Sequence, residues 1–218
     1  MATSFSKRTV LTLAALWLAP GSAHAQGFLE QFSYEGLGFS GIGFDIGPVG
    51  SDKLTTEVSG GVRVDYGMIA PRVRVMFGAN YFKGELNQEE ILQFERQLLQ
   101  NVQDPTGDAT VNVGRITWSN LEATLDLQYL FPSGPRFLTY IGLGIGAHVR
   151  NASGTAIENT FVEDALDTIA ASADLTLGMD FALSDNVLFT TDVRGSLSSE
   201  LIMASVRVGF MYRILGNN

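Results

Sequence analysis

The feature that most constrains this chain is a two-residue hydrophobic period that recurs in eight separate stretches. Between residues 54 and 68, apolar side chains occupy most positions of one parity, while the other parity is charged, polar or glycine. Successive side chains of a β-strand point to opposite faces, so each stretch predicts a strand with one apolar and one polar face. The eight predicted strands span residues 34–46, 54–68, 72–82, 120–131, 137–150, 168–183, 187–197 and 202–214.

The predicted strands are longer than those of soluble β-proteins. They span 11–16 residues, whereas strands of globular proteins have about 5–6 residues and a tilted strand needs about 9–11 to cross the hydrocarbon of a bilayer. In the first stretch the apolar parity changes between Phe39 and Ile42, which predicts a β-bulge near Ser40 and Gly41. After residue 25 no window holds 18 consecutive apolar residues, so the sequence predicts no transmembrane helix.

The connections between these strands alternate in length. Short turns join the second to the third, the fourth to the fifth and the sixth to the seventh strand, whereas the opposite end carries the longer insertions 84–114 and 151–167. This alternation is typical of outer-membrane barrels, whose short turns face the periplasm. Aromatic residues near the short turns predict an interfacial girdle and disfavour a secreted soluble barrel: Tyr66, Tyr129, Phe131, Phe137, Phe181, Phe189, Phe210 and Tyr212. The candidates for the opposite girdle are Phe44, Tyr81 and Trp118.

The N-terminal residues have the organisation of a secretory signal. Lys7 and Arg8 precede a short apolar core, and an Ala-x-Ala cleavage site ends at Ala25. The core is too short for a finished membrane span, although an uncleaved N-terminal anchor is the alternative. We therefore expect a cleaved signal peptide at residues 1–25, a barrel domain at residues 26–218, and export to the outer membrane of a Gram-negative-type bacterium.

Together, these features resemble the small eight-stranded outer-membrane β-barrel family, the OmpA/OmpX-like group. The resemblance covers residues 34–215 and rests on the strand pattern and on residues 206–215, which look like the family's C-terminal assembly signal. The chain departs from that signal because it ends in Gly216-Asn217-Asn218 instead of an aromatic residue. The resemblance implies an all-β, eight-stranded antiparallel up-and-down transmembrane β-barrel.

The inward parities of the strands carry many charges. An eight-stranded barrel is wide enough only for its own side chains, so charges inside it have to pair. Seven acids and seven arginines fall inside or at the rims, with His148, the only histidine after residue 25. Asp45 also faces inward in one of the two possible assignments of inward and outward positions in the first strand. The sequence thus predicts a plugged lumen with a charge network of Glu57, Arg63, Asp65, Arg72, Arg74, Glu122, Asp126, His148, Arg150, Asp174, Asp180, Asp192, Arg194, Arg207 and Arg213.

The two long insertions hold most of the net negative charge. Cleavage after Ala25 would leave 12 basic and 23 acidic residues, a net charge of −11, and residues 84–114 and 151–167 contribute −9 of it. Within the first insertion, residues 87–102 have the period of an amphipathic helix with a capping Asn87, so we expect a short helix in an outer loop. This helix could cover the barrel mouth, contact the membrane or dock a partner. Its apolar face holds Ile91, Phe94, Leu98, Leu99 and Val102.

No motif predicts a catalytic centre, a cofactor or a metal site. The chain has no cysteine, and its formal charge of −9 argues against nucleic-acid binding. Acids in residues 151–167 could bind Ca²⁺ or Mg²⁺, or bridge to lipopolysaccharide phosphates, but match no calcium loop. His148 near Ser153 would fit a lipid A-modifying enzyme, yet Arg150 stands where a deacylase-like His-x-Ser pattern needs serine.

We therefore expect a non-enzymatic integral outer-membrane β-barrel protein with a structural and surface-interaction role. Its expected partners are outer-membrane lipid and lipopolysaccharide, with a surface partner reached through residues 84–114 and 151–167, and we expect a monomer without a cofactor. A narrow porin or ion channel is the first alternative, and a lipid A-modifying enzyme is the second.

Overall fold

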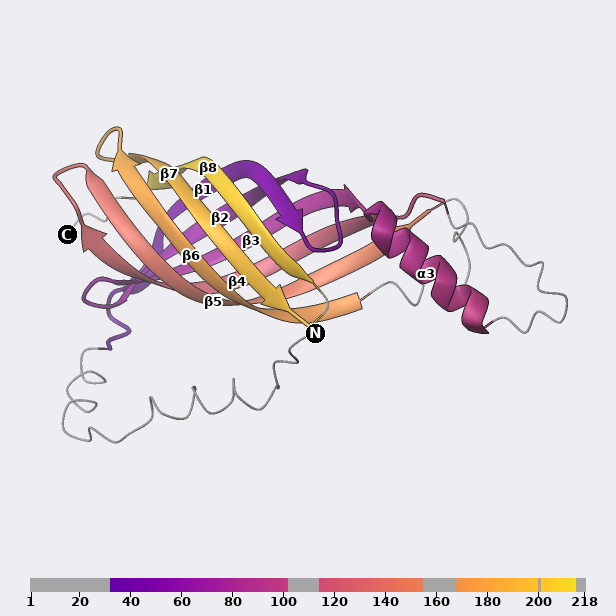
Figure 1. The fold of residues 1–218 in the computed structure, drawn as a ribbon. Coiled ribbons are helices and arrows are strands. Elements are labelled where there is room, and N and C mark those ends of the chain that lie inside the picture. Colours follow the sequence, from indigo (N-terminus) through magenta and orange to yellow (C-terminus); the bar gives the residue numbers. More distant parts are fainter. Residues whose placement is uncertain (1–31, 102–113, 155–167, 200, 215–218) are drawn as a thin grey trace, which may run out of the picture.

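The computed structural model describes residues 32–101, 114–154, 168–199 and 201–214. Eight antiparallel strands form a closed barrel in chain order, which confirms the predicted up-and-down topology (Figure 1). The strands are β1 (Leu37–Ser51), β2 (Glu57–Ala70), β3 (Val73–Glu85), β4 (Thr117–Pro132), β5 (Phe137–Ser153), β6 (Thr168–Ala182), β7 (Val187–Ser198) and β8 (Ile202–Arg213). The predicted signal, residues 1–25, lies outside the described residues, as do residues 102–113 and 155–167 of the two long insertions.

The strand register is most regular on one side of the barrel. β4 pairs with β5 without interruption from Thr117–Ser153 to Pro132–Leu138, and β5 pairs with β6 in the same way. The pairing of β1 with β2 shifts between Leu37 and Gly41, where the change of parity predicted a bulge. The short turns and the end of β8 lie at one end of the barrel, called here the turn end, and the long insertions lie at the other, the loop end (Figure 1).

The two faces of the barrel wall are opposite in polarity. Along β4, Leu121 and Leu125 are exposed on the outside, while Glu122 and Asp126 are buried inside. A large exposed apolar surface around a charged interior suits a barrel surrounded by lipid. None of the described helical residues forms a segment long and apolar enough to span a bilayer.

Aromatic side chains pair on the outer surface near the turn end. The rings of Phe137 and Phe181 are 4.7 Å apart between centroids, and those of Phe189 and Phe210 are 5.6 Å apart. These strand ends therefore carry the aromatic girdle that the sequence predicts. Trp118 does not contribute to the opposite girdle, because its side chain is only 6% exposed and points into the lumen.

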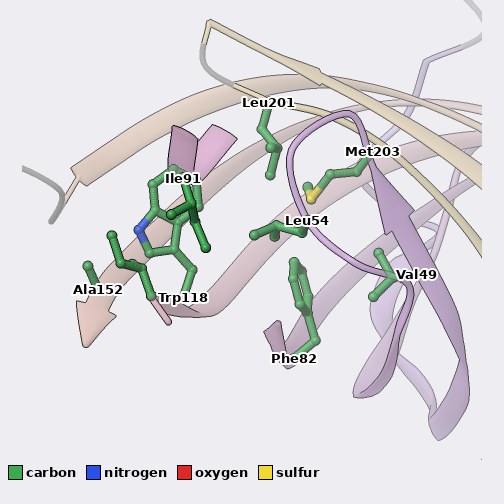
Figure 2. Close-up of a cluster of buried hydrophobic side chains, with 9 residues drawn as sticks. Val49, Leu54, Phe82, Ile91, Trp118, Ala152, Leu201 and Met203 are labelled. Atoms are coloured by element: carbon green, nitrogen blue, oxygen red, sulfur yellow. The ribbon is translucent and has the colours of Figure 1, made fainter. Parts of the chain in front are cut away.

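The loop end of the lumen is filled by apolar side chains, called here the apolar cap (Figure 2). The prediction that Leu54 lies on the outer face of a strand is wrong. β2 begins only at Glu57, and Ser51 Oγ accepts the backbone N–H groups of Lys53 and Leu54, which turns the chain inward. The cap consists of Val49, Leu54, Phe82, Ile91, Ile116, Trp118, Ala152, Leu201 and Met203.

The predicted helix is present as α3 (Gln88–Asn101). Asn87 Oδ1 accepts the N–H of Glu90 at 3.0 Å, and Asn87 Nδ2 donates to the carbonyl of Asp52 at 3.1 Å, so the first turn is both capped and tied to the β1–β2 loop. Ile91 is buried in the apolar cap, with Phe94 packed beside it. The helix then projects away from the barrel (Figure 1). Only its beginning covers the mouth, and Val102 lies outside the described residues.

Glycine on the inward face of β5 makes room for charged neighbours. A Cβ at Gly144 would collide with Oδ1 of Asp126, whose Oδ2 accepts from Arg194 Nη1 at 2.9 Å. We expect Gly144→Val to lower the free energy of unfolding by about 1–3 kcal/mol, measured by urea unfolding in lipid vesicles. Gly195→Val is the matched control, because nothing lies within 4 Å of a Cβ there. Equal losses for both variants would contradict the crowding at Gly144.

Candidate functional site

The buried charges of the lumen form four groups stacked from the turn end to the loop end. The first group surrounds Arg74 on β3. Its Nη1 lies 2.9 Å from Asp180 Oδ2 and 3.8 Å from Asp65 Oδ2, while Nε and Nη2 both donate to Gln128 Oε1, at 3.0 and 2.7 Å. The guanidinium carbon also lies 5.3 Å from the ring centre of Tyr140. Side chains from the five strands β2 to β6 meet at this guanidinium.

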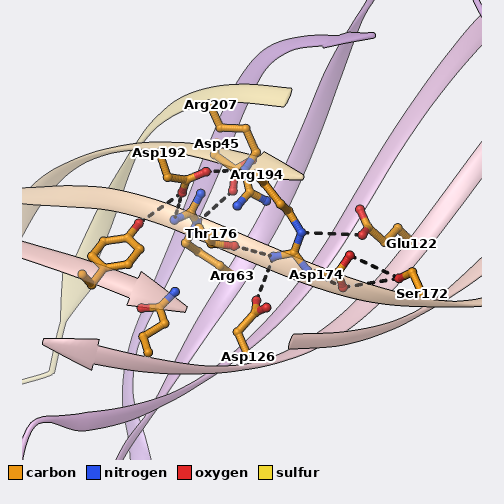
Figure 3. A network of polar contacts seen from close by, with 12 residues as sticks. Asp45, Arg63, Glu122, Asp126, Ser172, Asp174, Thr176, Asp192, Arg194 and Arg207 are labelled. Carbon is orange, nitrogen blue, oxygen red and sulfur yellow. Dashed lines mark hydrogen bonds and ion pairs between the residues drawn. The ribbon is translucent and has the colours of Figure 1, made fainter. Parts of the chain in front are cut away.

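The second group is centred on Asp192 of β7 (Figure 3). Asp192 Oδ2 accepts from Arg63 Nη1 at 2.9 Å and from the hydroxyl of Tyr140 at 3.2 Å, and Oδ1 accepts from Arg207 Nε at 2.7 Å. Arg63 Nε donates to Asp45 Oδ2 at 2.9 Å. Two guanidiniums and two carboxylates balance in this group.

The third group places three carboxylates around the single base Arg194 (Figure 3). Its Nη1 and Nη2 lie 2.9 Å from Asp126 Oδ2 and Asp174 Oδ2, respectively, and its Nε lies 3.8 Å from Glu122 Oε1. Nη1 is also 3.4 Å from the hydroxyl of Thr176. Three carboxylates face one guanidinium, so two negative charges in this group have no positive partner within it. The group therefore depends on neighbouring cations.

The fourth group lies directly beneath the apolar cap. Arg150 Nε donates to Asn120 Oδ1 at 3.3 Å, and Arg150 Nη2 donates to Ser198 Oγ at 3.1 Å. His148 Nδ1 approaches the same oxygen of Asn120 at 3.3 Å, and His148 Nε2 lies 3.8 Å from Glu122 Oε1. This group therefore connects to the Arg194 group through Glu122.

Three of the sequence-predicted residues lie outside this network. Arg72 is exposed in the β2–β3 turn, with a φ of 66°, and Glu57 and Arg213 are half-buried at the two rims. Glu57 and Arg213 thus keep the rim position that the sequence analysis allows, and only Arg72 points to solvent, because the chain turns there before β3 begins. Asp45, for which the sequence allowed either an inward or an outward position, is buried in the network. The other predicted residues are buried in the lumen: Arg63, Asp65, Arg74, Glu122, Asp126, His148, Arg150, Asp174, Asp180, Asp192, Arg194 and Arg207.

This placement changes the expected charge balance. Among the described residues, seven carboxylates are buried in the lumen against five guanidiniums, rather than seven against seven. The interior is therefore acidic by two charges when His148 is neutral. The sequence prediction named only charged residues and missed the neutral side chains that lie between them in the lumen. These side chains could have been found in the sequence because they occupy inward-facing positions of their strands: Asn120, Gln128, Tyr140, Ser172 and Thr176.

The side chains leave little free space within the network. The cavities beside Arg194 and Arg63 have volumes of about 20 and about 10 Å³, roughly the space of one water molecule each. An open recess of about 260 Å³ occupies the turn end, and Arg74 and Asp180 are among the residues that line it. Within the described ranges, no set of three or more His, Cys, Asp or Glu side chains is arranged to hold a metal ion.

The chain resembles known proteins in both sequence and fold. Residues 11–213 match the family model of the outer membrane protein beta-barrel domain. The fold is similar to Neisserial surface protein A, with a TM-score of 0.55 at 10% identity over 83% of this chain and 100% of that chain. It is also similar to the outer membrane protein OprG from Pseudomonas aeruginosa, with a TM-score of 0.51 at 16% identity over 83% and 98%. No curated protein sequence matches the chain.

Proposed function

Because this chain belongs to the family of outer membrane protein β-barrel domains, we propose that it is a non-enzymatic structural protein of the outer membrane whose lumen is plugged. The observation that carries this proposal is the double closure of the lumen. The apolar cap fills the loop end, and below it the cavities beside Arg194 and Arg63 are only water-sized. Such a barrel offers its outer loops, not its interior, to other molecules.

The placement of His148 supports the non-enzymatic proposal. His148 is fully buried in the lumen, whereas Ser153 is exposed at the end of the same strand. Five residues of extended strand separate them by about 16 Å, and residues of opposite parity point to opposite faces. A histidine and a serine in this arrangement cannot share a proton in a hydrolytic reaction.

The outer loops support an interaction at the cell surface. Among the described residues at the loop end, Asp52, Glu85 and Glu89 are exposed acids. Under this proposal, residues 84–114 and 151–167 meet lipopolysaccharide, with divalent cations bridging their carboxylates to its phosphates, or meet a surface partner. The protein is a monomer in the outer membrane after export and cleavage near Ala25.

A narrow cation-selective channel is the second candidate, favoured by the acidic excess of the lumen and by its small cavities. The two functions differ in planar-bilayer recordings of the purified protein. We expect the plugged barrel to give no stable single-channel conductance in 1 M KCl. Reproducible, cation-selective steps would overturn the plugged-barrel proposal in favour of the channel.

A further inference from the structure

Two buried side chains face each other across the β4–β5 pair without completing a hydrogen bond. Glu122 and His148 are directly opposite in the register, and Glu122 Oε1 lies 3.8 Å from His148 Nε2. Neither atom has a hydrogen-bond partner among the described residues. His148 is fully buried and Glu122 is 7% exposed. The protonation state of this pair is therefore set by the surrounding side chains and not by contact with bulk water.

The other ring nitrogen of His148 shows where its hydrogen lies. Nδ1 faces Asn120 Oδ1 at 3.3 Å, and the same oxygen accepts from Arg150 Nε at 3.3 Å. A guanidinium can only donate, so Asn120 must present its oxygen to Arg150. A ring nitrogen that faces this oxygen has to carry a hydrogen. A neutral imidazole has only one ring hydrogen, so Nε2 would then hold a bare lone pair.

A bare lone pair facing an ionised carboxylate would leave Nε2 as a buried acceptor without a donor, and Oε1 with only the guanidinium Nε of Arg194, 3.8 Å away, beyond hydrogen-bond distance. We propose that the lumen binds one proton between Glu122 and His148, taken from water when the barrel folds. The proton makes the pair either an imidazolium that donates to a carboxylate or a carboxylic acid that donates to a neutral imidazole. In both forms the two orphaned atoms complete one hydrogen bond.

The charges around the pair favour such a proton. β4 contributes Asp126 beside Glu122, β6 contributes Asp174, β7 contributes Arg194, and β5 contributes Arg150 next to His148. β3 adds the neutral Asn80 opposite Glu122, and β8 adds Arg207, which lines the same cavity as Glu122 but is paired with Asp192, 2.7 Å from its Nε. Glu122, Asp126 and Asp174 thus stand against Arg150 and Arg194. One bound proton offsets the excess of carboxylates over guanidiniums in this set, which lowers the cost of keeping it away from water.

The exported protein suits a direct test, because His148 is its only histidine if cleavage follows Ala25. The protein is purified without a histidine tag, labelled with ¹⁵N at histidine, and studied by NMR in lipid nanodiscs at pH 7. His148→Gln assigns the signal. In parallel, infrared spectra of the wild type and of Glu122→Gln show whether Glu122 contributes a carboxylic-acid band. Exposed carboxyls are ionised at this pH and do not contribute.

We expect a hydrogen on Nδ1, together with one sign of the additional proton. That sign is either a second hydrogen on Nε2, or a carboxylic-acid band that disappears in Glu122→Gln. A ring nitrogen Nδ1 without a hydrogen would overturn the proposal. So would a neutral ring with its hydrogen on Nδ1 and no carboxylic-acid band.

The Glu122→Gln variant adds a second readout that a purely structural role would not give. A glutamine amide can donate to Nε2 without an added proton, so we expect His148 to be neutral with its hydrogen on Nδ1. Glu57→Gln is the matched control, since Glu57 lies at the rim and its Oε1 accepts from the exposed hydroxyl of Thr55. An imidazolium that persists unchanged in Glu122→Gln would contradict the proposed site.

Discussion

Arg194→Met is expected to lower the free energy of unfolding by about 3–5 kcal/mol, the cost of leaving a buried ion pair without one partner. The reason is that Arg194 is the base shared by Asp126, Asp174 and Glu122. Methionine fills a similar volume, so the loss would reflect charge and not a cavity. The measurement is urea unfolding in lipid vesicles, with heat-modifiable gel migration reporting the folded fraction.

A rescue variant separates charge from packing in this experiment, and remains informative if Arg194→Met does not fold. Arg194→Met combined with Asp126→Asn and Asp174→Asn removes the two carboxylates that Arg194 holds at 2.9 Å. We expect this variant to recover a folded fraction. Arg115→Met, at an exposed base of the loop end, should change stability by less than about 0.5 kcal/mol. If Arg194→Met were as stable as Arg115→Met, the Arg194 group would not stabilise the barrel.

Trp118→Ala should also cost about 3–5 kcal/mol, because truncation of a buried aromatic side chain removes apolar burial and leaves a cavity. Trp118 packs in the apolar cap with Phe82 and Ile91 (Figure 2). The same unfolding assay measures the loss, and Trp118→Phe is the conservative control that keeps most of the buried surface.

Under the proposed function the cap and the network each close the lumen, so Trp118→Ala also tests the plugged barrel. We expect the variant to lose stability and still to give no stable conductance, since the charged groups lie beneath the cap. Conductance steps that appear only in Trp118→Ala would show that the apolar cap is the sole barrier. Unchanged stability would show that the cap does not hold the loop end together.

Strand positions and faces could be predicted because alternation is a local property of the chain. The predicted strand at residues 120–131 lies within β4 (Thr117–Pro132), with the expected inward and outward parities. Parity does not show where the lipid-covered part of the barrel ends. Leu54 and Trp118 were placed on the outside for this reason, whereas at the loop end the apolar side chains gather inside the lumen.

The partners within the network could not be predicted from the sequence. Arg63 contacts Asp192, which is 129 residues away, and Arg74 contacts Asp180, which is 106 residues away. A strand's parity tells which side chains face inward, but the residue opposite them depends on the register of every intervening strand. The same cause left the role of Asp45 open, because one irregular residue in β1 reverses its face.

The long sequence separation of these lumen contacts has a consequence for how the barrel enters the membrane. Asp126 on β4 and Asp174 on β6 both meet Arg194 on β7, so their charges stay unmatched until the next-to-last strand arrives. A hairpin-by-hairpin route would expose them to hydrocarbon at high cost. We therefore expect the contacts across the lumen to couple membrane insertion to barrel closure, and a chain truncated before β7 to stall at the membrane surface.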